Sequence, residues 1–134
     1  MTDDKKIDYI LRTVEERDIR YLRLCFTDVL GNLKALSISP EELEEAFVEG
    51  IGFDGSSVDG FASQAQSDLL AFPDAATFQV LPWENDGEAV ANVFCDIQTP
   101  SRTPFEGDPR RVLERAFRKA DEKGYTMNVG PKLE

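Results

Sequence analysis

The sequence of 134 residues contains no histidine, only two cysteines and no long apolar run. Without histidine, the chain cannot form a Ser-His-Asp or Cys-His triad, a histidine-containing zinc site or an imidazole switch near neutral pH. No stretch approaches the ~20 apolar residues of a membrane span, and the N-terminal MTDDKK lacks the apolar core of a signal peptide. We therefore expect a soluble, cytoplasmic protein with no membrane partner.

Lys and Arg are few in this sequence, and one long segment contains none of them. The chain carries 26 Asp and Glu against 15 Lys and Arg, a formal net charge of -11, which does not favour a nucleic-acid partner. No Lys or Arg occurs between Lys34 and Arg102, whereas thirteen Asp and Glu do. This acidic segment cannot neutralise itself by internal salt bridges. It is either a solvated face or a surface that meets cations, whether metal, ammonium or a partner's Arg and Lys.

Periodicity predicts an α+β arrangement before residue 99. The expected elements are a helix over 4–17, strands over 19–27 and 33–38 joined by a turn, a helix over 40–49, and strands over 67–72, 76–81 and 88–98. Leu22, Leu24 and Phe26 alternate on the side that we expect to face the core. Ser39 and Glu42 have the spacing of a capping box. Five strands with one helix after the first hairpin is the order of a β-grasp fold.

Three segments depart from this regular pattern. Residues 50–66 are rich in Gly and Ser, and we expect no regular element there. Residues 99–104 are Pro-rich and polar, like a boundary between domains. Beyond them, Asp108 and Pro109 begin a helix that ends at Gly124, and a strand is expected over 125–129. One helix and one strand cannot bury a core alone, so 104–134 is expected to begin a second domain.

Cys25 and Cys95 each lie inside an apolar, strand-like run. We interpret them as small buried hydrophobic residues, not as a disulfide or a reactive pair.

The segment with chemical character is Phe53–Gly60, which reads FDGSSVDG. Its glycines let a backbone approach a ligand, and Asp54, Ser56 and Ser57 offer short oxygen-bearing side chains. A carboxylate there could hold a cation or accept a proton, and the hydroxyls could orient a small polar substrate. The spacing fits neither an EF-hand nor a P-loop. Asp-Gly-Ser-Ser is also simply a good turn, so the residues alone leave both interpretations open.

Several spaced blocks resemble bacterial and archaeal type I glutamine synthetase. They are Gly52–Phe61 (GFDGSSVDGF), Ser67-Asp68, Phe72-Pro-Asp74, Pro82-Trp83, Cys95-Asp96 and Thr103–Arg110 (TPFEGDPR). The blocks occur in the family's order and at its spacing along the whole chain. The resemblance implies that residues 1–103 form the family's N-terminal β-grasp domain and that 104–134 begin its catalytic domain.

The resemblance also implies a reaction and an assembly. The family makes glutamine from glutamate, ammonia and ATP through γ-glutamyl phosphate, using Mg²⁺ or Mn²⁺. Its active sites lie between neighbouring subunits in a double ring of twelve. In the family's pattern the aspartate at Asp54 helps to bind ammonium and take its proton, and the serine at Ser57 lies beside it. For Ser56 and Asp59 we favour turn geometry.

The departure from the family's pattern is at the end of the chain. The family reads Gly-Pro-Glu-x-Glu there, with both glutamates as metal ligands. Glu134 matches the second ligand, but Lys132 stands in place of the first, and an ammonium group repels a cation. We expect this chain alone to bind none of the family's cofactors and to be inactive. The alternative is a free-standing, non-catalytic β-grasp module that docks on full-length subunits or interferes with them.

Overall fold

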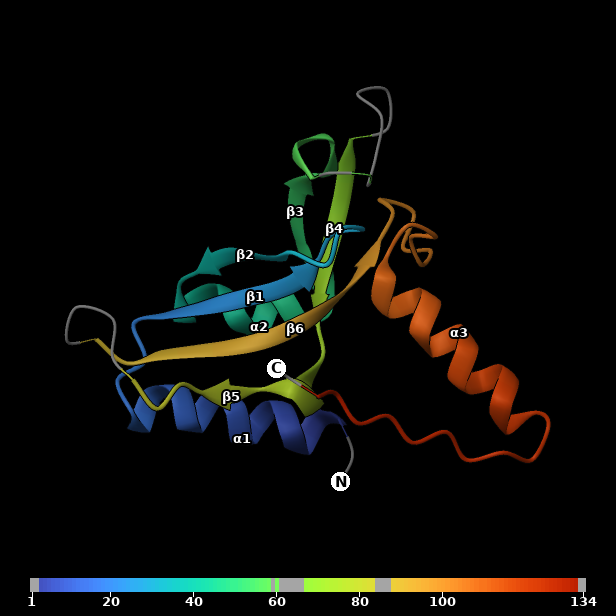
Figure 1. Ribbon diagram of the computed structural model, residues 1–134. Coiled ribbons are helices and arrows are strands. Elements are labelled where there is room, and N and C mark those ends of the chain that lie inside the picture. The colour runs from blue at the N-terminus through green and yellow to red at the C-terminus, as the bar shows by residue number, and fades with distance from the viewer. Residues whose placement is uncertain (1–2, 59, 61–66, 84–87, 133–134) are drawn as a thin grey trace.

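A mixed six-stranded sheet organises the chain, and the computed structural model describes residues 3–58, 60, 67–83 and 88–132 (Figure 1). The helices are α1 (Asp3–Glu16), α2 (Leu43–Glu49) and α3 (Pro109–Asp121). The strands are β1 (Tyr21–Thr27), β2 (Leu33–Ile38), β3 (Ile51–Asp54), β4 (Asp68–Pro73), β5 (Gln79–Val80) and β6 (Val90–Gln98). Within these ranges, no helix is long and apolar enough to cross a membrane.

The strand order is β2-β1-β6-β4-β3, with β5 paired to β6 outside this path. The central strands β1 and β6 run parallel, with Leu22 opposite Ala91, and every other pair is antiparallel. A first hairpin, a helix and a last strand that returns to the centre beside the first give a β-grasp arrangement. The predicted α+β fold class is thereby confirmed.

The core lies between the sheet and helices α1 and α2. The predicted inward positions are confirmed, since Leu22 and Leu24 are 0% exposed and Phe26 is 2% exposed. They share one cluster with residues from both helices and from β4 and β6; among these are Ile10, Val14, Leu43, Ala46, Ala71, Val93 and Ile97. Full burial of each Leu side chain stabilises the fold by roughly 1.5–3 kcal/mol.

The turn of the first hairpin is organised by one buried carboxylate. Asp28 is 1% exposed, and its Oδ1 accepts the backbone N–H groups of Leu30 at 2.9 Å and Asn32 at 2.8 Å. Its Oδ2 accepts the Asn32 side-chain amide at 2.9 Å and lies 3.5 Å from Lys34 Nζ. Burial raises the pKa of the Asp28 carboxyl, but the contacts with Asn32, Leu30 and Lys34 outweigh burial and lower it.

The capping box that the sequence predicts is confirmed. The backbone N–H and the hydroxyl of Ser39 both donate to Oε2 of Glu42, at 2.9 and 3.0 Å. The helix begins as a tight turn over Pro40–Glu42 and continues as α2. It ends at Gly50, whose φ of 73° lies in the left-handed region that favours glycine.

Both cysteines are free and buried, as expected. Cys25 is 1% exposed and Cys95 is 0% exposed. Burial raises the pKa of both thiols, and for Cys95 the neighbouring charges of Cys25 and Asp96 add to that rise. Protonated, enclosed thiols are poor nucleophiles.

The structure corrects three expectations. Residues 51–54, placed in an irregular segment, form β3 because they pair with β4. The strand expected over 76–81 is shorter: Ala75–Thr77 is a turn, and only β5 follows. The strand expected over 125–129 is absent, since residues 125–130 are irregular and pair with no strand in the described part of the chain. The turn expected over 84–87 lies outside the described residues.

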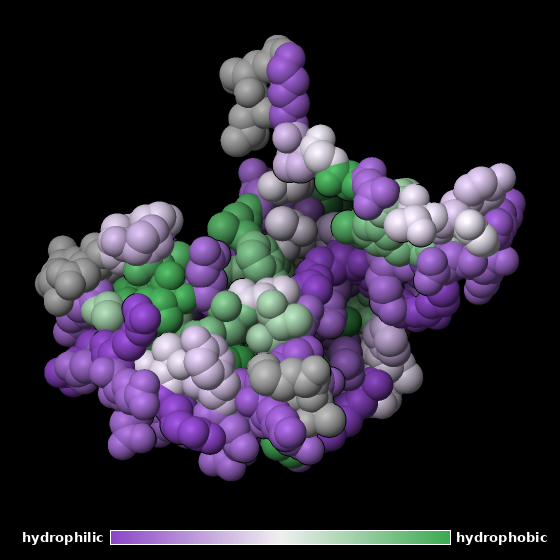
Figure 2. Space-filling view, turned by 90° about the horizontal axis from the view of Figure 1, so that it is seen from below, coloured by the Kyte–Doolittle hydropathy of each residue, from purple (hydrophilic) through white to green (hydrophobic). Residues whose placement is uncertain are grey.

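Helix α3 begins as the sequence predicts, with Asp108 as the cap and Pro109 in its first turn. It projects from the end of β6, and none of its residues is buried (Figure 1). Its apolar side chains Val112 and Leu113 are 51% and 50% exposed. The molecule seen from below is mainly hydrophilic, with hydrophobic residues in separate patches (Figure 2). A domain boundary near residue 103 stays a prediction.

Candidate functional site

The Asp54 loop, which we define as Asp54–Val58, begins where β3 ends. Strand β3 pairs antiparallel with β4, with Phe53 opposite Leu69. The Phe53 ring packs on Phe26 of β1, with a centroid distance of 5.0 Å. The N–H of Gly55 donates to the carbonyl of Ser67 at 2.6 Å, and Val58 is 7% exposed. The loop therefore rests on the sheet through buried apolar contacts and a backbone hydrogen bond.

Asp54 is exposed at the tip of β3, and its carboxylate is held by Ser56. Oδ1 of Asp54 accepts the Ser56 backbone N–H at 2.9 Å and the Ser56 hydroxyl at 2.6 Å. These two hydrogen bonds lower the pKa of the Asp54 carboxyl, the hydroxyl being the larger cause. The loop thus presents a negative charge near neutral pH, on a side chain whose orientation is restrained.

The two serines have different contacts. Ser57 donates its hydroxyl to the backbone carbonyl of Asp54 at 2.7 Å, so it lies beside Asp54 but does not touch the carboxylate. The sequence favoured turn geometry for Ser56, and its hydrogen bonds do form a tight turn over Gly55–Ser57. Yet Ser56 is also the serine that bonds the carboxylate. No local pattern separates the two, because both follow Asp54 within reach of a short side chain.

Asp68 is a further carboxylate near this loop. It is the first residue of β4, it is exposed, and it stands opposite Asp54 in the antiparallel register. Directly opposite residues of an antiparallel pair point to the same side of the sheet. Two like charges there repel each other and attract cations. Sequence reasoning noted the Ser67-Asp68 block but assigned Asp68 no role; the block itself was the available signal.

The metal-ligand prediction, Glu134, lies outside the described residues, as does Asp59. Lys132 is described and is exposed. In the described ranges no three His, Cys, Asp or Glu side chains lie close enough together to hold a metal ion. A single glutamate two residues from a lysine is a poor donor set for Mg²⁺ or Mn²⁺, which prefer several oxygen ligands. The described residues of this chain therefore do not form a divalent metal site by themselves.

One pocket among the described residues lies away from the Asp54 loop. It has a volume of about 470 Å³ and lies between the end of α1, the segment before β1 and the start of the capped turn. Its apolar lining comes from Leu11, Val14, Ile19 and Pro40. In Figure 1, α1 and β3 are at opposite ends of the fold, so this pocket cannot share a ligand with Asp54.

Comparisons with known proteins agree with this geometry. Residues 18–100 match the family model described as "Glutamine synthetase, beta-Grasp domain". Glutamine synthetase of Mycobacterium tuberculosis is 53% identical over 133 residues, which is 98% of this chain and 30% of that protein. Glutamine synthetase of Thermotoga maritima is 48% identical over 128 residues, covering 96% of this chain and 29% of that protein. The chain thus spans less than a third of the length of these curated relatives.

Solved structures give the same fold. The Plasmodium falciparum glutamine synthetase matches with a TM-score of 0.78 over 88% of this chain and 23% of that chain, at 21% identity, which supports the fold alone. A structure described as a GmaS/ADP complex matches with a TM-score of 0.75 and 29% identity, over 84% of this chain and 25% of that chain. Since the family model covers more than half of the sequence, the chain belongs to the glutamine synthetase family and contains its N-terminal β-grasp domain.

Proposed function

We propose that this chain is the N-terminal part of a glutamine synthetase and that the Asp54 loop supplies the ammonium side of an active site completed by a neighbouring subunit. The observation that carries the proposal is the exposed Asp54 carboxylate, held at 2.6 Å by the Ser56 hydroxyl at the tip of β3. Ammonium is a small cation with four N–H donors, and a fixed, ionised carboxylate is a suitable acceptor for it.

The lowered pKa of the Asp54 carboxyl favours ammonium binding as its role in the open loop. An ionised carboxylate attracts ammonium, but a carboxylate of low pKa is a weak base, so in the open loop Asp54 binds better than it deprotonates. A neighbouring subunit that covered the loop would remove water, and desolvation raises a carboxyl pKa. Asp54 would then become a stronger base as the site closes. Ser57 restrains the backbone of Asp54 by donating its hydroxyl to the Asp54 carbonyl. Asp68, opposite Asp54 in the register, adds negative potential beside the Asp54 carboxylate.

The rest of the site must come from elsewhere. The described residues offer no metal cluster, and the Asp54 loop alone cannot enclose glutamate. In the complete enzyme, Mg²⁺ or Mn²⁺ and ATP would be held by parts that this chain does not supply. We infer a cytoplasmic homo-oligomer, a dodecamer by the family's pattern, and an isolated chain that forms no glutamine. An open reading frame that continues past Glu134 supports this proposal, and a stop codon there supports the free-standing module.

The test uses the whole gene product that contains this sequence. Initial rates are measured with varied ammonium at saturating glutamate and ATP, for the unmodified protein and for Asp54→Asn. We expect kcat/KM for ammonium to fall by roughly 100-fold or more, the usual scale for a group that moves a proton. Asp8→Asn, an exposed carboxylate of α1, is the matched control and should leave the rate unchanged. An Asp54→Asn enzyme with unaltered ammonium saturation would sink the proposal.

A further inference from the structure

Some carboxylates of the acidic segment between Lys34 and Arg102 form ion pairs with arginines that follow this segment in the sequence. Arg102 pairs with Glu49 at the end of α2. Arg110, in the first turn of α3, pairs with Asp74 and Asp96. Part of the acidity that the sequence left unexplained therefore faces cations of the same chain. These pairs join the segment after β6 to α2, to the turn that follows β4 and to β6 itself.

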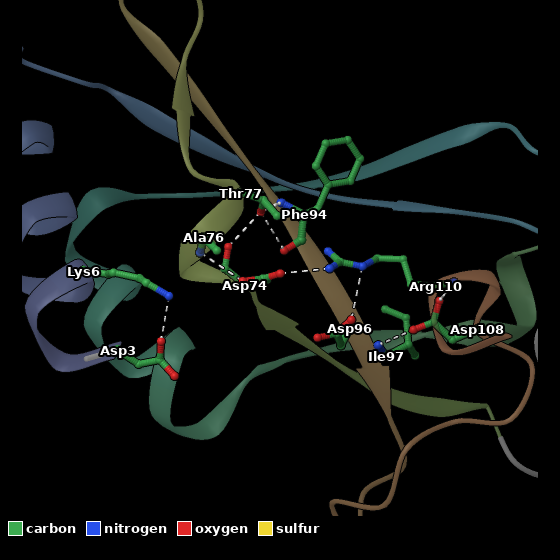
Figure 3. A network of polar contacts seen from close by, with 10 residues as sticks. All are labelled: Asp3, Lys6, Asp74, Ala76, Thr77, Phe94, Asp96, Ile97, Asp108 and Arg110. Atoms are coloured by element: carbon green, nitrogen blue, oxygen red, sulfur yellow. Dashed lines mark hydrogen bonds and ion pairs between the residues drawn. The ribbon is translucent and has the colours of Figure 1, made fainter. Parts of the chain in front are cut away.

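Arg110 bridges two separate parts of the sheet (Figure 3). Its Nη2 donates to Oδ2 of Asp74 at 2.9 Å, just after β4, and its Nε lies 3.3 Å from Oδ1 of Asp96 on β6. Asp74 is itself held, because its Oδ1 accepts the N–H of Ala76 at 3.0 Å. A planar guanidinium can bond two carboxylates along different directions at once, which the point charge of a lysine does less well.

Asp108 holds the same end of α3. It is 1% exposed, and its Oδ1 accepts the N–H of Arg110 at 3.0 Å while its Oδ2 accepts the N–H of Ile97 at 2.9 Å. One side chain thus caps α3 and ties the cap to β6. A cation in the first turn opposes the helix dipole, so the dipole does not account for Arg110 at this position. Its two carboxylate partners do.

These contacts matter because α3 has no buried residue of its own. Apolar packing against the sheet therefore contributes little to its orientation. The guanidinium of Arg110 pairs with Asp74 and Asp96, and the Asp108 carboxylate accepts the backbone N–H of the same residue. If the Arg110 side chain were removed, the carboxylates would be left to repel one another. Helix α3 would keep its link to β6 through Asp108 but would lose its link to Asp74, just after β4.

We propose that Arg110 is a positioning residue that fixes the direction in which α3 leaves the β-grasp sheet, and so places the Asp54 loop relative to the part of the protein that follows α3. The second half of this statement rests on the proposed function; the first half does not. The blocks that contain Asp74, Asp96, Asp108 and Arg110 resemble the family, yet none of these residues lies in the Asp54 loop. Their convergence on one network gives them a structural role.

The first arm of the test measures the orientation of α3 in the 134-residue chain. Spin labels are placed at Ser37→Cys on β2 and Lys119→Cys on α3, both exposed positions, because the native thiols are buried. We expect one narrow distance distribution in the parent chain and a broad one in Arg110→Gln. Arg118→Gln is the matched control, since Arg118 pairs with Glu114 inside α3, and it should stay narrow. An equally narrow distribution in Arg110→Gln overturns the proposal.

The second arm uses the whole gene product. We expect Arg110→Gln to lower kcat by up to about 100-fold, the effect of misplacing a reacting group by roughly 1 Å. Arg110→Lys should recover part of the rate, and it keeps the test valid if Arg110→Gln fails to fold. A broadened spin-label distance distribution in Arg110→Gln, together with a kcat equal to that of the unmodified protein, overturns the positioning role. Failure of the proposed function is seen separately, in an Asp54→Asn enzyme that keeps its ammonium saturation.

Discussion

Gly55 provides a sharp test of how the Asp54 loop is seated. A Cβ atom at this position would lie 2.5 Å from Leu69 Cδ1 and 3.2 Å from the carbonyl oxygen of Ser67. Carbon atoms in ordinary contact are ≈ 3.5–4.0 Å apart, so Gly55→Ala requires a displacement of roughly 1 Å. Leu69 is 3% exposed and has little room, and the Ser67 carbonyl already accepts the Gly55 N–H. The substitution therefore strains both β4 and the loop.

The size of the effect follows from two opposing contributions. Overpacking of a filled site destabilises by about 1–3 kcal/mol, while replacing Gly by Ala stabilises by about 0.4–1 kcal/mol through the unfolded chain. We expect Gly55→Ala to lower the free energy of unfolding by about 1–2 kcal/mol. Gly52→Ala, on the preceding strand β3, is the matched control. Its Cβ would meet nothing within 4 Å, so it should be neutral or slightly stabilising.

Urea unfolding of the 134-residue chain, followed by far-ultraviolet circular dichroism, measures the difference. Small proteins lose about 1–3 kcal/mol of stability per molar urea, so the midpoints of the two variants should differ by roughly 1 M. A Gly55→Ala variant as stable as Gly52→Ala would refute the reasoning, because Leu69 would then have space that the structure does not show.

Three further predictions concern the core, the hairpin turn and the thiols. Leu24→Ala should lower the free energy of unfolding in urea by about 2–5 kcal/mol, whereas Leu30→Ala, at a side chain 71% exposed, should change it by under about 0.5 kcal/mol. Asp28 has a pKa below its ordinary 3.8, so its stabilising contribution is complete above that pH and is lost as the pH falls through the lower folded value. The melting temperature of Asp28→Asn should accordingly fall less steeply at acid pH than that of the parent chain. An equally steep fall in both would contradict the hydrogen bonds around Asp28. Cys25 and Cys95 should react with a thiol reagent far more slowly in the native chain than in guanidinium; equal rates would mean that the sheet opens readily.

Local chemistry was enough to predict much of this fold. Alternation predicted the inward residues of β1, because a half-buried strand presents every second side chain to the core. Ser39 and Glu42 predicted the start of the second helix, because a capping box needs only residues three apart. The loop that contains Asp54, Ser56 and Ser57 was singled out because glycines and short oxygen-bearing side chains stand together there. The choice of Asp54 and Ser57 as site residues rests on the family resemblance and stays a prediction.

Features that depend on distant partners were missed. Strand β3 has four residues between two glycines, and only its pairing with β4 makes it a strand. The strand expected over 76–81 is shorter because the Asp74 side chain caps a turn over Ala75–Thr77. The sequence Asp-Ala-Ala-Thr was the signal for that turn, and it was overlooked. Residues 125–129 alternate like a strand but have no partner strand in the described chain. The bridge from Arg110 to Asp74 joins residues 36 positions apart, so no local motif reveals it.

The parallel pairing of β1 with β6 has a consequence for how the protein folds. Tyr21 must meet Val90, so a long loop closes before the centre of the sheet exists, and such non-local pairing slows folding. On the ribosome, at ~5–20 residues per second, the first hairpin waits some seconds for its central neighbour. During that wait the apolar face of β1 and one open edge of the hairpin are unprotected, which makes the nascent chain prone to aggregation. Substitutions that weaken β6 should therefore reduce the yield of folded protein more than their effect on equilibrium stability would suggest.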